Sequence, residues 1–93
     1  MSDMFKFNAE SDRPVHVAIR EGRVWVALAD GRVIANPLDW HPWLVQASPE
    51  QQAHVELNAF SVYWPDLDEG LDIQGMMMGI PSYPPHKTEN VTA

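Results

Sequence analysis

The chain contains no cysteine. Disulfide bonds, a catalytic thiolate and cysteine-ligated zinc are therefore excluded. The chain also lacks long apolar runs: none approaches the ~18 residues that a membrane-spanning helix needs, and the N-terminal residues form no apolar signal segment. These absences predict a cytoplasmic protein with no membrane partner.

Glycine is scarce too, with five residues in the whole chain. Gly70, Gly75 and Gly79 have neither the spacing nor the strand–helix setting of a phosphate-binding loop. No serine stands in the sequence context of a hydrolase nucleophile. We therefore expect no cofactor and no enzymatic activity.

Basic residues are outnumbered: 6 Lys and Arg face 13 Asp and Glu, for a net charge of −7. Residues 41–93 hold one basic residue, Lys87, and seven acids, so this part carries −6 of the total. Such a surface repels phosphate backbones, which predicts no direct nucleic-acid binding and a protein partner with a basic surface. The simpler alternative is a solvated acidic face that only keeps the chain soluble.

Ninety-three residues suffice for one domain. We assign residues 1–80 to a single α+β domain. Residues 81–93 are rich in proline and then polar, which predicts an extended or disordered tail.

Alternating apolar residues predict three antiparallel strands, at about 14–19, 23–29 and 32–35. The second strand is apolar on both faces, so it should be central. Glu21-Gly22 is a tight-turn signal. Asp30-Gly31 is a two-residue hairpin signal, in which both central positions need a positive φ.

Two short helices should follow and pack on one face of this β-meander. Asp39 is a candidate N-cap for a helix over residues 40–46. Ser48 should cap a second helix running to about Leu57, with Gln51 completing a capping box.

The remaining pattern predicts a fourth strand over residues 60–64, a strand or turn at 71–73 and one helical turn at 74–79. The fourth strand or turn would complete the meander. The residues expected in the core are Val24, Val26, Leu28, Leu44, Leu57, Val62 and Trp64.

Acidic residues gather at Asp66, Asp68, Glu69 and Asp72. Their spacing fails the EF-hand pattern, because the sixth and twelfth positions do not carry the required glycine and glutamate. The four histidines show no paired ligand spacing either. We predict no tight metal site, with weak Mg²⁺ or Ca²⁺ association and local turn chemistry as the alternatives for the acidic loop.

Trp40 and Trp43 are three residues apart and would share a helix face, one inward and one partly exposed. An exposed tryptophan beside acidic residues is typical of a protein-binding hot spot. The predicted partner-binding residues are therefore Trp40, Trp43, Asp66, Asp68 and Glu69. Core packing is the alternative for the tryptophans, and residues 76–78, three methionines, are a second candidate surface.

The order of these motifs resembles a prokaryotic domain family of unknown function, DUF2442, over about residues 14–79. The matching residues are Asp30-Gly31-Arg32, Pro37-Leu38, Pro42, Leu44, Ala47-Ser48-Pro49-Glu50-Gln51, Glu56-Leu57, Trp64-Pro65, Leu67-Asp68-Glu69, Leu71, Ile73 and Gly75.

The chain departs from the family pattern at four positions. Trp43 and Gln52 replace basic residues, Tyr63 replaces a histidine, and Gly70 replaces an acid. These changes are expected to alter surface or loop groups rather than the core.

The resemblance implies a small α+β fold. It also implies a place beside a second small domain family, in pairs proposed as toxin–antitoxin modules. We therefore expect a non-enzymatic acidic protein-interaction module, the antitoxin-like partner of a second small protein. A homodimer is compatible with this interpretation. The alternatives are an acidic inhibitor that mimics nucleic acid in a basic groove, and a small metal-dependent enzyme.

Overall fold

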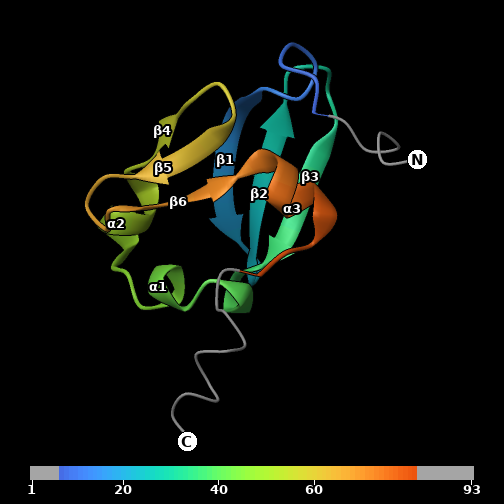
Figure 1. Ribbon diagram of the computed structural model, residues 1–93. Coiled ribbons are helices and arrows are strands. Elements are labelled where there is room, and N and C mark those ends of the chain that lie inside the picture. Colours follow the sequence, from blue (N-terminus) through green and yellow to red (C-terminus); the bar gives the residue numbers. More distant parts are fainter. Residues whose placement is uncertain (1–6, 82–93) are drawn as a thin grey trace, which may run out of the picture.

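The computed structural model describes residues 7–81 and has the predicted α+β fold, with two three-stranded antiparallel sheets (Figure 1). The first sheet consists of β1 (Pro14–Arg20), β2 (Arg23–Leu28) and β3 (Val33–Pro37), and the second of β4 (Glu56–Leu57), β5 (Ser61–Trp64) and β6 (Glu69–Asp72). The helices are η2 (Leu38–Trp40, a 3-10 helix), α1 (Pro42–Val45), α2 (Pro49–Ala53) and α3 (Ile73–Met78). Residues 82–93, the greater part of the predicted tail, lie outside the described residues.

The predicted meander is confirmed, with β2 between β1 and β3. The chemistry of its turns differs from the prediction. Glu21 and Gly22 form the two-residue turn in which both residues have positive φ, at 53° and 71°. At the next turn the Leu28 N–H donates to the Arg32 carbonyl at 2.8 Å, which leaves three loop residues, and only Gly31 has a positive φ, at 98°.

The helix predicted over residues 40–46 is interrupted. The 3-10 helix η2 ends at Trp40, His41 has a non-helical φ of −129°, and α1 then begins at Pro42. A proline disfavours the helical conformation in the residue before it, which explains the break. The proposed N-cap role of Asp39 is therefore wrong, and Trp40 and Trp43 lie on different elements.

The capping box of α2 is confirmed. The Gln51 N–H donates to the Ser48 hydroxyl at 3.1 Å, and the Ser48 N–H donates to the Gln51 side chain at 2.9 Å. The helix ends at Ala53 rather than Leu57, because Leu57 pairs with Val62 in the edge strand β4. Its side chain stays 43% exposed, so its predicted place in the core is wrong.

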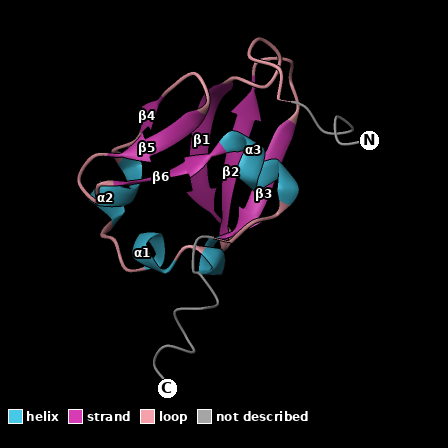
Figure 2. Cartoon of the chain, in the orientation of Figure 1, coloured by secondary structure: helices cyan, strands magenta, loops and turns pink. Residues whose placement is uncertain are grey.

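The predicted fourth strand is confirmed as β5, but it does not complete the meander. It pairs with β4 and β6 in a separate sheet, which lies across one face of the first sheet together with α3 (Figure 2). The helical turn predicted at residues 74–79 falls on α3. The strand or turn predicted at 71–73 is divided between β6 and α3.

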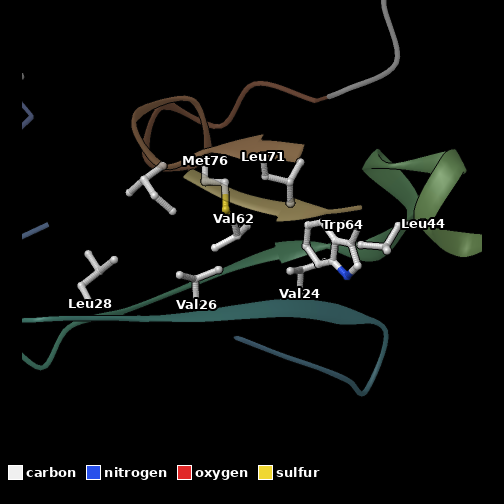
Figure 3. Close-up of a cluster of buried hydrophobic side chains, with 9 residues drawn as sticks. Val24, Val26, Leu28, Leu44, Val62, Trp64, Leu71 and Met76 are labelled. Atoms are coloured by element: carbon white, nitrogen blue, oxygen red, sulfur yellow. The ribbon is translucent and has the colours of Figure 1, made fainter. Parts of the chain in front are cut away.

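The core lies between the two sheets. Side chains of β2 point toward those of β5, β6 and α3, and α1 closes one end with Leu44 (Figure 3). Apart from Leu57, every residue predicted for the core is buried. Leu71, Ile73 and Met76 complete the cluster.

Candidate functional site

The outer face of the second sheet gathers acidic side chains around a tyrosine. Val62 and Trp64 point into the core, so the alternation of β5 turns Tyr63 the other way. Residues paired across strands share a face, and Tyr63 pairs with Glu56 while Ser61 pairs with Asp72. Glu56, Tyr63, Asp72 and Asp68, which is bonded to Tyr63, are called the acidic outer face below.

Tyr63 is held in place on this face. Its hydroxyl donates to the Asp68 carboxylate at 2.6 Å. On β6 it faces Gly70, which has no side chain to displace the ring: a Cβ there would lie 3.4 Å from the ring and 2.8 Å from the Val62 carbonyl oxygen. The hydrogen bond to Asp68, with desolvation and the negative charges of Asp68 and Glu56, raises the pKa of Tyr63. Tyr63 therefore remains a neutral hydrogen-bond donor at physiological pH.

The three acids predicted to steer a partner lie together at the turn between β5 and β6, and all are exposed. Asp66 approaches His54 at the end of α2, with 3.0 Å between Oδ2 and Nδ1. The Asp68 carboxylate accepts the hydrogen bond from the Tyr63 hydroxyl. The backbone of Asp68 is left-handed, with a φ of 53°, a conformation that aspartate tolerates. Glu69 is the first residue of β6 and pairs with Trp64 of β5.

The two tryptophans predicted as anchors lie elsewhere, on η2 and α1. Trp43 is half-buried, and its ring meets that of Trp64 edge-on with 5.6 Å between centroids. Trp40 is half-buried beside Gly79. Trp43 therefore supports the core from one side. Neither tryptophan belongs to the acidic outer face.

Glu56, Tyr63 and Asp72 were missed as members of one surface. The alternation of residues 61–64 was the available signal, because Val62 and Trp64 inward place Tyr63 outward. The alternation of one strand does not predict that Glu56 and Asp72 lie beside Tyr63. These two residues belong to β4 and β6, and only the register between the strands brings them to the same face.

Within residues 7–81, no three His, Asp or Glu side chains come close enough together to hold a metal ion. His41 is buried, at 1% exposure, and burial lowers its pKa. No helix in the described part of the chain is both long and apolar enough to cross a membrane.

The family model for DUF2442, a protein family of unknown function, matches residues 14–82. The chain belongs to DUF2442. A crystal structure of a protein of unknown function from Rhodospirillum rubrum is 29% identical, with a TM-score of 0.66, over 76% of this chain and 90% of that one. A solution structure of an uncharacterized protein from Chromobacterium violaceum shares the fold, with a TM-score of 0.69 and 23% identity over 84% of this chain and 75% of that one. No curated protein matches the chain.

In this DUF2442 member the Asp-Gly-Arg motif has a structural role. The Arg32 guanidinium donates to Asp30 at 2.9 Å and also to Asp12, which is 5% exposed. The backbone N–H of Asn8, the Arg32 guanidinium and the Ser11 hydroxyl lower the pKa of Asp12, and together they outweigh the desolvation that raises it. The motif thus ties the β2–β3 turn to the N-terminal loop.

Two departures from the DUF2442 pattern also take on structural meaning. Trp43, in place of a basic residue, packs against Trp64. Gly70, in place of an acid, lies inside β6 and was wrongly expected in a loop. Both therefore change packing as well as surface charge.

Proposed function

We propose that this DUF2442 member is a non-enzymatic protein-interaction module whose acidic outer face binds a partner with a basic surface. One observation carries the proposal: Glu56, Asp68 and Asp72 surround a positioned Tyr63 on an open sheet face, while no Lys or Arg occurs between Arg32 and Lys87. The partner we favour is a second small protein. The chain would bind it in the cytoplasm as an antitoxin binds its toxin.

The face has the two components that protein recognition uses. Uncompensated exposed carboxylates speed the encounter with a basic surface. Tyr63 adds an aromatic contact whose orientation is already set by Asp68 and Gly70, so little side-chain freedom is lost on binding. Trp40 and Trp43, which lie on η2 and α1 rather than on this face, stay predicted additional anchors, and Asp66 and Glu69 stay predicted steering charges.

The test is affinity capture from a lysate of the source organism, followed by binding kinetics with the captured protein. The test variant combines Glu56→Gln, Asp68→Asn and Asp72→Asn. Asparagine preserves the acceptor for Tyr63 at position 68 and the helix cap of α3 at position 72, where the carboxylate accepts the Gly75 N–H at 2.9 Å.

The matched control combines Glu10→Gln, Glu21→Gln and Asp39→Asn, three exposed acids outside the second sheet. It removes the same charge. We expect the association rate of the natural chain and the control to fall steeply with ionic strength. The association rate of the test variant should be slower and should depend less on salt, because only Asp66 and Glu69 remain as steering charges. Equal association rates for test and control variants would show that the acidic outer face is not the binding surface.

A further inference from the structure

The outer edge of β1 carries backbone groups that no strand within residues 7–81 pairs. Leu28 bonds to Arg32 on the β3 side of β2, whereas Ala29 bonds to Arg13 on the β1 side. Hydrogen-bonding direction alternates along a strand, so Val24 and Val26 point their N–H and C=O groups toward β3. Their partners on β1 are Ile19 and Val17. The backbone groups of Val17 and Ile19 therefore point away from β2, to the open edge of the sheet.

A groove of about 360 Å³ runs along this edge. Val17, Ala18 and Ile19 all line it, although the side chain of Ala18 points to the opposite face of the sheet from the other two. A groove that touches all three must follow the backbone of the strand. Its other wall consists of α2 and the residues after it: Pro49, Gln52, Ala53 and Val55.

The chemistry of the groove selects its occupant. None of the lining side chains is charged. The one polar side chain, that of Gln52, donates its amide N–H to the Leu44 carbonyl at 2.9 Å. The backbone carbonyl of Gln52 is also engaged, because it accepts the Trp64 indole N–H at 2.9 Å. What remains is an apolar trough beside donors and acceptors at the spacing of a β-strand. An extended peptide can use both features, with apolar side chains in the trough and its backbone on the donors and acceptors of the strand.

We propose that β1 accepts an extended segment of a partner protein as an added strand, with alternate apolar side chains entering the groove between β1 and α2. The length of the pairing is limited, because a register shift between Pro14 and His16 bends β1 at one end and Arg20 ends it at the other. The added strand pairs with Val17–Ile19. This surface is separate from the acidic outer face and does not depend on it.

The first experiment selects peptides from a displayed library of short random sequences, with the full chain as bait. We expect enrichment of sequences with apolar residues at alternate positions. A synthetic peptide of the enriched sequence is then added to the labelled chain, and amide hydrogen exchange is followed by NMR. Exchange should slow at Val17 and Ile19 and change little at Ala18, whose N–H already faces β2.

A pair of variants isolates the backbone contribution. Val17→Pro removes the outward N–H and the side chain, and Val17→Ala removes the side chain alone; proline is tolerated on a strand edge where its nitrogen faces outward. The peptide should bind Val17→Pro about three- to tenfold more weakly than Val17→Ala, the equivalent of one hydrogen bond. Should the proline variant unfold, Ala53→Trp fills the groove from α2, with Glu50→Trp, on the same helix but outside the groove, as control.

Three results would overturn the proposal. The first is the absence of alternating apolar sequences among the selected peptides, or equal binding by both variants of either pair. The second is protection of Val17 and Ile19 in the free chain at all concentrations, which would mean that the chain fills its own groove. The third is protection that rises with protein concentration, which would assign the edge to a second copy.

Discussion

Trp64 connects β5 to α1 and α2 within the core. It is fully buried, its indole N–H donates to the Gln52 carbonyl at 2.9 Å, and Trp43 packs on its edge. Trp64→Ala should lower the free energy of unfolding by roughly 3–5 kcal/mol, because truncation of a large buried aromatic leaves a cavity. Denaturant melts measure this. Trp64→Phe, which keeps a ring but loses the donor, should cost less, and a loss below about 1 kcal/mol for the alanine variant would contradict the assignment.

His41 makes stability depend on pH. Burial lowers its pKa from the ordinary value of 6.5, so below that pH the unfolded chain binds more protons at this residue than the folded chain does. Its contribution to the free energy of unfolding is complete above pH 6.5 and declines as the pH falls below that value, by at most about 1.4 kcal/mol per pH unit. Melts across this range should show the decline in the natural chain and a smaller one in His41→Gln. Equal slopes would mean that His41 is not responsible.

At the scale of elements, the hairpin of β5 and β6 depends on close backbone approach at Gly70. A Cβ at this position would lie 2.8 Å from the Val62 carbonyl oxygen, so the strands must move apart to accept it. Gly70→Ala should destabilise the fold by about 1–3 kcal/mol, the usual cost of overpacking. Gly75→Ala is the matched control, because a Cβ there meets nothing nearer than 3.6 Å. Thermal melts compare the two, and equal midpoints would refute the close-contact argument.

The elements also show where sequence patterns are reliable. The capping box at Ser48 and Gln51 is formed as predicted because both partners lie within one helical turn. The end of the same helix was misjudged, since Glu56 and Leu57 take part in β4 through pairing with Tyr63 and Val62. Pairing with a later strand outweighs the local preference of a few residues for a helix.

At the scale of the whole molecule, the excess of negative charge is concentrated on the second sheet. The arginines of the described residues lie on the first sheet and its flanking loops, while the second sheet and its turn carry carboxylates. Titration with Ca²⁺, Mg²⁺ or Zn²⁺ followed by calorimetry should show no binding at micromolar affinity, because the described acids do not converge on one point. A micromolar site that disappears in Asp66→Ala and Asp68→Ala would reopen the metal-dependent alternative.

The sequence by itself determined the features that depend on neighbouring residues. The three strands of the meander follow from alternation, the turn at Glu21-Gly22 from backbone freedom, and the α2 cap from side chains three residues apart. The family was also recognisable from the order of its motifs, and the match over residues 14–82 confirms it.

The tertiary structure alone decided how distant segments combine. It placed β4, β5 and β6 in a second sheet, moved Trp43 against Trp64 and assembled Glu56, Asp68 and Asp72 around Tyr63. Among the described residues, it also left the outer edge of β1 without a strand partner, beside α2. The physical reason is that strand register and sheet packing are set by contacts between segments far apart in the chain, which no local pattern encodes.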